Sequence, residues 1–132
     1  LVKDLSERAE KIRNRMVDSS VDNMLKITND GRKLALDQRL TNDMLEDFEH
    51  SKVATCADNI YSIWDKTNDD KSAQLVFCDL STPHNDGKFN VYDDLKTKLI
   101  DRGIPEEEIA FIHDANTDAR KQGLPSSLIY QN

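Results

Sequence analysis

Two short apolar runs with a helical pattern between them constrain the fold more than any other feature of this sequence. The first run is Gln74–Leu80 and the second is Ile109–His113. Between them, Asn90 is a suitable N-cap and Gly103 a suitable C′ residue for a helix. Strand, helix and strand in succession predict a βαβ unit with parallel strands and a right-handed crossover. Because the first run does not alternate with polar residues, we expect it to form a central, buried strand.

The residues before this unit are predicted to be helical. Leu5, Ala9, Ile12 and Met16 fall on one stripe of a helix, and the Asp-Ser-Ser sequence at 18–20 suggests the N-cap of a second one. Residues 21–37 fit either a helix or two short strands around the Asn-Asp-Gly turn at 29–31. We favour the helix, because residues 32–36 are mostly good helix formers. Residues 41–50 are acidic and aperiodic, which is typical of a solvated connector.

Ser51 is the predicted cap of a further helix, with Val53, Ala57 and Ile60 among its inward positions. A helical turn is expected at 106–108, and another helix at 117–121. We therefore divide the chain into a helical lead-in and connector at 1–50, an α/β segment at 51–122 and a tail at 123–132. The predicted fold class is α/β, in which N-terminal helices precede a βαβ unit.

The charge balance argues against a self-sufficient nucleic-acid-binding protein. The 132 residues contain 18 basic and 25 acidic side chains, a net charge of −7, whereas such proteins carry a basic face. No apolar run approaches the ~20 residues of a membrane span, and no signal segment opens the chain. Two cysteines in apolar surroundings, Cys56 and Cys78, indicate buried thiols in a reducing compartment. We expect a cytoplasmic location and no membrane partner.

Most familiar catalytic patterns are absent. The glycines at 31, 87, 103 and 123 cannot build a phosphate-binding loop, so no cofactor site is predicted. The histidines are far apart in sequence, and no Cys-x-x-Cys pattern indicates a metal. A site built from His84, His113 and Asp114 is conceivable, as is Cys78 acting as a nucleophile with His113 as its base. Solvated loop histidines and a structural thiol are the simpler interpretations, and no catalytic or metal-binding residue is assigned.

One edge of the predicted sheet is the best candidate for a binding site. Ligands of open parallel sheets lie beyond the carboxyl ends of the strands. Ser81 and Thr82 follow the first strand, and His113 and Asp114 end the second. Hydroxyls and free backbone N–H groups there suit phosphate oxygens. The alternative is that these residues serve only ordinary loop and capping roles.

A resemblance adds to this interpretation. Residues 74–121 read QLVFCDLSTPHNDGKFNVYDDLKTKLIDRGIPEEEIAFIHDANTDARK. This stretch resembles the start of the second RecA-like lobe of superfamily 2 helicases, in particular the Swi/Snf-type DNA-dependent ATPases. It is similar to bacterial, phage or mobile-element proteins that join a DNA adenine methyltransferase to a helicase. The segments VDNMLKITNDGRKLALDQRL and SKVATCADNIYSIW extend the resemblance, which covers roughly residues 5–122.

The resemblance implies a truncated RecA-like, P-loop-type parallel sheet. Residues 76–82 correspond to helicase motif IV, and residues 94–114 to the helix and strand that follow it. Ser81, Thr82, His113 and Asp114 are then the positions nearest DNA. The family's motifs V and VI and its first lobe, which bind ATP and Mg²⁺, have no counterpart here. We expect a piece of a motor, either excised or naturally truncated, that is inactive as an ATPase alone.

Two further expectations concern function and partners. In its parent protein, the chain would contribute scaffold and part of the DNA-contacting edge, and would meet DNA and the first helicase lobe. The alternative is a stand-alone α/β interaction module without catalytic activity. A sheet edge left uncovered would favour self-association.

Overall fold

The structure is a computed structural model that describes residues 1–83, 86–114 and 127–130. The chain divides into two units, Leu1–Glu46 and Asp47–Asn132. The division falls just before the end of the lead-in that was expected at residue 50. Within the described residues, no helix is long and apolar enough to cross a membrane.

The first unit consists of two α-helices and a short 3-10 helix. Helix α1 spans Val2–Arg13, α2 spans Met24–Leu36 and η1 spans Gln38–Leu40. The helix expected within residues 21–37 is therefore confirmed, and the alternative hairpin does not form. The expected cap at residues 18–20 is wrong, because the side chain of Asn23 accepts the Lys26 N–H and caps α2.

A three-way ion pair joins the two helices of the first unit. Arg8 on α1 donates from Nε to Asp22 Oδ2 at 2.8 Å and from Nη1 to Asp30 Oδ2 on α2, also at 2.8 Å. These bonds hold the pKa of Asp22 below its usual range, chiefly through the hydrogen bond from Arg8. Because α1 has no buried residue, this polar contact is an important part of what holds it to α2.

The second unit alternates helices with short strands. Ser51 caps α3 by accepting the Ala54 N–H, as expected, and Asn90 caps α4 by accepting the Asp93 N–H. Gly103 ends α4 in the left-handed region at φ 113°, which a glycine adopts without steric cost. The elements are α3 (Lys52–Thr67), β1 (Gln74–Phe77), α4 (Val91–Arg102), η2 (Glu106–Glu108), β2 (Ile109–Phe111), η3 (Ile112–Asp114) and β3 (Ser127–Tyr130).

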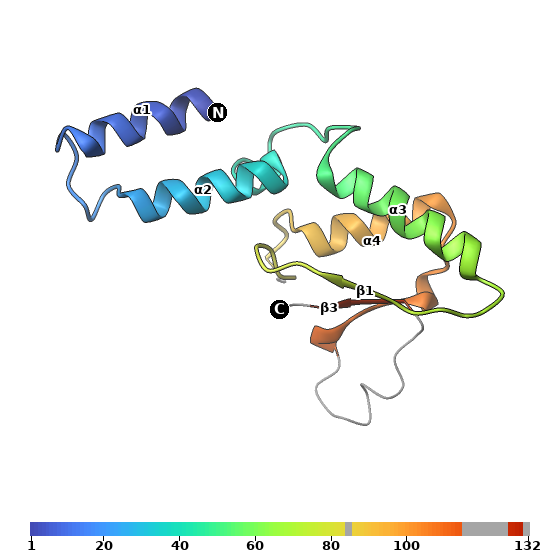
Figure 1. Cartoon of the computed structure of the whole chain (residues 1–132). Helices are drawn as coiled ribbons and strands as arrows, with labels where there is room; N and C mark the ends of the chain where they lie inside the picture. The colour runs from blue at the N-terminus through green and yellow to red at the C-terminus, as the bar shows by residue number, and fades with distance from the viewer. Residues whose placement is uncertain (84–85, 115–126, 131–132) are drawn as a thin grey trace. The chain divides into compact units, whose positions relative to one another are not determined.

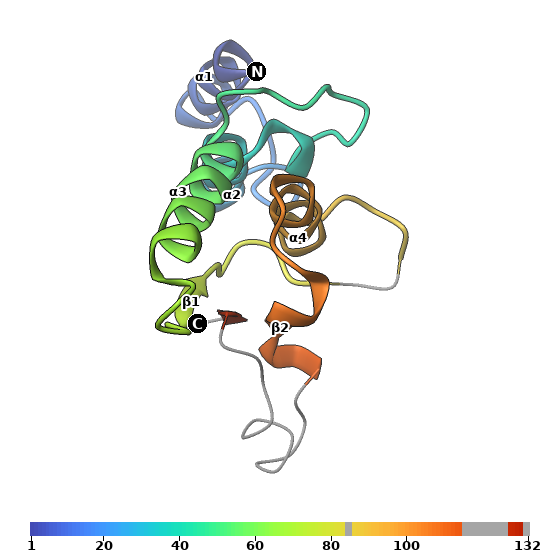
Figure 2. The ribbon, with the colours of Figure 1, turned by 90° about the vertical axis from the view of Figure 1, so that its right-hand side faces the viewer.

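The strands of the second unit form a small parallel sheet in the order β1–β3–β2. Leu75 of β1 and Ala110 of β2 both pair with Leu128 of β3. Figures 1 and 2 show α3 and α4 on the same side of this sheet, with α3 over β1 and α4 over β2. The chain is therefore a helix-rich α/β structure in the part that is described.

Two strand predictions need correction. The first apolar run was expected to be a central buried strand, but β1 stands at the edge of the sheet, and Leu75 and Phe77 are 55% and 57% exposed. An apolar run does not by itself say which faces of a strand are covered, and here the described helices cover one face. The second run ends as a strand at Phe111, because η3 begins at Ile112.

The segment 123–132 was expected to be a tail, yet Ser127–Tyr130 forms β3 between the other two strands. The helix expected at 117–121 lies outside the described residues.

The core of the second unit lies between the helices and the sheet. Tyr92 and Ile104 have the largest fully buried side chains. Burial of this apolar surface is what fixes α4 across the sheet. The other buried apolar residues are Val53, Ala54, Ala57 and Ile60 of α3, Val91, Leu95 and Leu99 of α4, and Ile109 and Phe111 of β2.

Candidate functional site

Tyr92 contacts both the segment that follows β1 and the carboxyl end of β2. Its hydroxyl donates to the backbone carbonyl of Cys78, just after β1, at 2.9 Å. Its ring packs edge-on against Phe111 at the end of β2 and against His113 in η3, with centroid distances of 5.4 and 5.2 Å. The side chain of Tyr92 is fully buried. Tyr92 therefore connects the two segments in which the candidate residues were predicted.

The environment of Tyr92 keeps its phenol neutral. Burial, with smaller contributions from Cys78 and Asp79, raises the pKa of Tyr92 to about 12. The hydroxyl thus remains a hydrogen-bond donor at neutral pH, and it cannot act there as a general base. Its role is to position the ends of the strands.

Ser81 serves a structural role at the start of α4. Its side chain is buried, and its Oγ accepts the Val91 N–H at 2.9 Å. Asn90 accepts the Asp93 N–H at 2.9 Å and donates from Nδ2 to the Asp93 carboxylate at 2.6 Å. These bonds satisfy N–H groups that a helix otherwise leaves unpaired. Ser81 therefore has less freedom to contact a ligand than the sequence suggested.

The start of α4 is a poor anion site. Helix N-termini attract anions through their free N–H groups and their dipole. Here the Val91 and Asp93 N–H groups already have side-chain acceptors, and Asp93 and Asp94 place carboxylates in the first turn. A phosphate group would meet negative charge at this point.

The other predicted residues are more accessible. Thr82 and His113 are partly exposed, and Asp114 is exposed. All three lie beyond the carboxyl ends of parallel strands, which is where open sheets bind ligands. Among the described residues, the accessible polar groups at this edge include the Thr82 hydroxyl, the His113 imidazole and the carboxylates of Asp79 and Asp114. They can donate to and accept from a polar ligand, but they carry little positive charge.

The thiols have the surroundings of structural residues. Cys78 Sγ lies 3.9 Å from the carbonyl oxygen of Ser81, a weak S–H···O contact within its own turn. Burial, and to a smaller extent Cys78, raises the pKa of the Cys56 thiol. A reactive cysteine needs the opposite shift, because the thiolate is the nucleophile.

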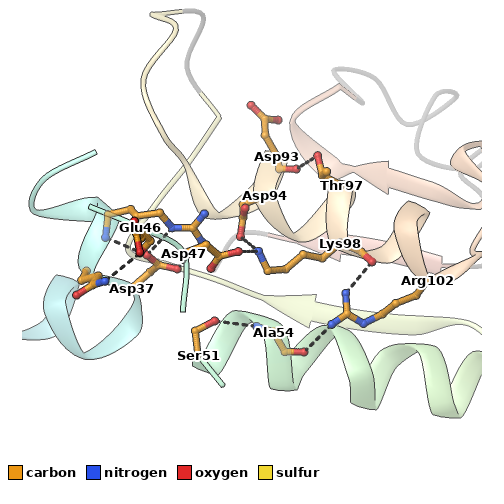
Figure 3. Close-up of polar contacts among 12 residues, drawn as sticks. Asp37, Glu46, Asp47, Ser51, Ala54, Asp93, Asp94, Thr97, Lys98 and Arg102 are labelled. Carbon is orange, nitrogen blue, oxygen red and sulfur yellow. Dashed lines mark hydrogen bonds and ion pairs between the residues drawn. The ribbon is translucent and has the colours of Figure 1, made fainter. Parts of the chain in front are cut away.

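Charged side chains of α4 form hydrogen bonds within the helix and with neighbouring segments (Figure 3). Lys98 donates to Asp94 on its own helix at 2.9 Å and to Asp47, at the start of the unit, at 2.6 Å. Burial lowers the pKa of Lys98, but the hydrogen bonds to Asp47 and Asp94 outweigh it, so the pKa is raised. The ammonium is therefore fully charged at neutral pH.

Arg102 extends the network to α3. It donates from Nε to Asp58 at 2.7 Å and from Nη1 to the Lys98 carbonyl at 2.9 Å. Within the described residues, no group of three or more His, Cys, Asp and Glu side chains is arranged to hold a metal ion. The hydrogen bonds of Lys98 to Asp47 and of Arg102 to Asp58 link α4 to neighbouring segments of the unit.

Sequence reasoning identified the strand ends but missed Tyr92. A signal was present, because Tyr92, Leu95 and Leu99 fall at positions i, i+3 and i+7, one buried face of α4. The pairing of Asp47 with Lys98 had no comparable signal. Comparisons of this chain with protein-family models, curated proteins and solved structures found no match.

Proposed function

We propose that the second unit belongs to the second RecA-like lobe of a superfamily 2, Swi/Snf-type DNA-dependent ATPase. The resemblance of residues 74–121 to that family is one support. The observation that carries the proposal is that Tyr92 joins the carboxyl ends of two parallel strands, β1 and β2. This arrangement gathers Thr82 and His113 at one edge, where a nucleic-acid backbone would contact hydroxyl and imidazole groups.

In this proposal the chain provides scaffold and part of the DNA track, and the first lobe of the parent provides nucleotide chemistry. We expect no site for ATP and Mg²⁺ in this chain. Gly31 lies inside α2 and Gly103 ends α4, so neither belongs to a glycine-rich phosphate loop. DNA-stimulated ATP turnover by the purified chain would contradict this division of roles.

The acidic character of the edge sets the expected affinity. Asp93 and Asp94 open α4, and Asp114 follows β2. These carboxylates repel phosphate groups, which weakens binding to the nucleic-acid backbone. The isolated chain should therefore bind duplex DNA weakly and only at low salt, with the parent's remaining surface supplying the basic groups.

Fluorescence anisotropy of a labelled duplex at low ionic strength tests the DNA-contacting edge. We expect weak binding that decreases as salt is added, and a further loss in the double variant Thr82→Ala/His113→Ala. Thr67→Ala is the matched control, because it removes a hydroxyl at the C-terminal end of α3 that donates to the Ile63 carbonyl of the same helix. Equal binding by wild type and the double variant would refute the proposed contacts.

A second candidate function is a protein-interaction module without catalytic activity. It is favoured by the exposed apolar side chains that gather at β1 and α3, with Leu75, Phe77 and Ile63 between 47% and 57% exposed. Exposed apolar patches on soluble domains mark interaction surfaces. Self-association in solution combined with no DNA binding at low salt would favour this candidate over the motor fragment.

A further inference from the structure

A cavity lies between the two helices of the first unit. It has a volume of about 320 Å³, and its lining residues come from α1, α2, η1 and the segment that follows η1. Figure 1 shows α1 and α2 side by side and running in opposite directions. Small-molecule sites in proteins have volumes of about 300–1,000 Å³, so this cavity suits a small ligand.

Leucine side chains form the apolar part of this cavity. Leu5 on α1 packs toward α2, where its Cδ1 lies 3.9 Å from the position that a Cβ would occupy at Gly31. Leu34 and Leu40 are partly buried, and Leu1 lies at the start of α1. An aliphatic group bound among these side chains would lose its contact with water, which favours binding. The cavity therefore suits a ligand with an aliphatic part.

Two of the four charged side chains that line the cavity have no partner among the described residues. Arg8 and Asp30 pair with each other at 2.8 Å, so their charges offset each other. The side chains of Asp4 on α1 and Lys33 on α2 form no hydrogen bond or ion pair with any described residue. The cavity thus offers one available carboxylate and one available ammonium group.

The pairing of the two helices places these two charges across from each other. Asp4 is one turn before Arg8 on α1, and Lys33 is nearly one turn after Asp30 on α2. Because the helices run in opposite directions, both steps lead the same way from the Arg8–Asp30 pair. The carboxylate and the ammonium therefore lie on opposite walls of the cavity without pairing. A ligand that carries both charges can pair with both of them at once.

We propose that this cavity binds a free amino acid with an aliphatic side chain, such as leucine. The ammonium group of the ligand pairs with Asp4, its carboxylate pairs with Lys33, and its side chain contacts Leu5 and Leu34. A simple carboxylic acid or amine fits less well, because it would satisfy only one of the two charges. The cavity shares no residue with the DNA-contacting edge, so each proposal can fail without the other.

An NMR titration of the intact, isotope-labelled chain with leucine measures the binding and locates it. We expect a dissociation constant of about 1 mM or lower, which suits a ligand of this size. The amide signals that shift should belong to α1, α2 and η1, whereas those of α3 and α4 should stay unchanged. Free glycine, which lacks the aliphatic part, should bind more weakly than leucine.

Two analogues of leucine assign each charge of the ligand to its partner. Isocaproate lacks the ammonium group, and isoamylamine lacks the carboxylate. Asp4→Asn should weaken leucine binding about fivefold without weakening isocaproate binding, because isocaproate has no group that pairs with Asp4. Lys33→Gln should weaken leucine binding by a similar factor without weakening isoamylamine binding. An analogue that still binds its variant also shows that the variant is folded.

Matched controls separate these contacts from general charge effects. Glu10→Gln and Lys11→Gln carry the same charge changes at exposed positions of α1 outside the cavity. Both controls should leave the affinity for leucine unchanged.

Three results would overturn the proposal. The first is no binding of leucine up to about 10 mM. The second is binding that shifts signals of α3 and α4 in place of those of α1 and α2. The third is an Asp4→Asn variant that loses as much affinity for isocaproate as for leucine.

Discussion

The hydroxyl of Tyr92 on α4 donates a 2.9 Å hydrogen bond to the backbone carbonyl of Cys78 beyond β1. The same ring packs edge-on against Phe111 and His113 at the end of β2. One buried side chain thus sets the positions of two strand ends that do not pair directly with each other. Any ligand bound by Thr82 and His113 would depend on this contact, although Tyr92 is itself inaccessible.

Removing the hydroxyl of Tyr92 should destabilise the second unit. Tyr92→Phe keeps the ring packing and leaves the Cys78 carbonyl without its donor, which costs about 1–2 kcal/mol in the free energy of unfolding. Urea unfolding followed by circular dichroism measures the change. Tyr61→Phe is the matched control, since the Tyr61 ring packs near Trp64 and its hydroxyl has no hydrogen bond within the described residues. Equal stability of the two variants would contradict the role assigned to Tyr92.

The ionisation of Tyr92 should occur at unusually high pH. Its pKa is raised to about 12, mainly by burial, so the folded protein holds the phenolic proton more tightly than the unfolded chain does. The associated stabilisation is complete below the ordinary pKa of tyrosine and is lost as pH rises through the raised value. Tyrosinate absorbance in wild type and Tyr92→Phe isolates this group by difference. A difference curve centred near the ordinary value of 10 would show that Tyr92 is solvated.

Local signals in the sequence were sufficient for the helix boundaries of the second unit. Ser51 and Asn90 are caps because their side-chain oxygens reach N–H groups only three residues away. The exposure of β1 could not be read in the same way, because it depends on which elements cover the sheet. The strand at Ser127–Tyr130 is defined by its pairing with β1 and β2, which are distant in the sequence, so its own residues give little sign of it.

The candidate site was only partly predictable for a related reason. The residues that follow parallel strands lie at the same edge of the sheet, so the sequence alone was enough to predict that Thr82 and His113 lie there. The roles of Ser81 and Tyr92 come from contacts with partners ten and fourteen residues away. Lys98 and Asp47 are separated by 51 positions, and a surplus of acidic residues offers many equivalent partners for one lysine.

Replacing Lys98 should weaken the packing of α4. Its side chain is only 13% exposed, and Asp94 beside it is 15% exposed. Lys98→Met would remove the hydrogen bond from Lys98 to the Asp94 carboxylate, at a cost of about 1–2 kcal/mol in the free energy of unfolding. Thermal and urea unfolding measure the loss. Lys96→Met is the control, because Lys96 pairs with the exposed Glu106 and should change stability by no more than about 0.5 kcal/mol.

The contribution of Lys98 should also depend on pH. Because its pKa in the folded protein is raised, the stabilisation is complete below the ordinary pKa of lysine. It is lost as pH rises through the raised value. The stability difference between wild type and Lys98→Met should therefore shrink in strongly alkaline solution, and a constant difference would indicate loss of packing alone.

Removing the Arg8 guanidinium should release α1 from α2. No residue of α1 is buried, and Arg8 links Asp22 and Asp30 through three hydrogen bonds. We expect Arg8→Gln to increase amide hydrogen exchange throughout α1 while α3 and α4 keep their protection. Arg13→Gln, at the last residue of the same helix, is the matched control.

In wild type, the low pKa of Asp22 means that its stabilisation is present above the ordinary pKa of aspartate and is lost as pH falls through the lowered value. Acid should therefore expose α1 in wild type, whereas α1 in Arg8→Gln should be exposed at neutral pH already. Unchanged exchange in that variant would show that apolar contacts alone hold α1.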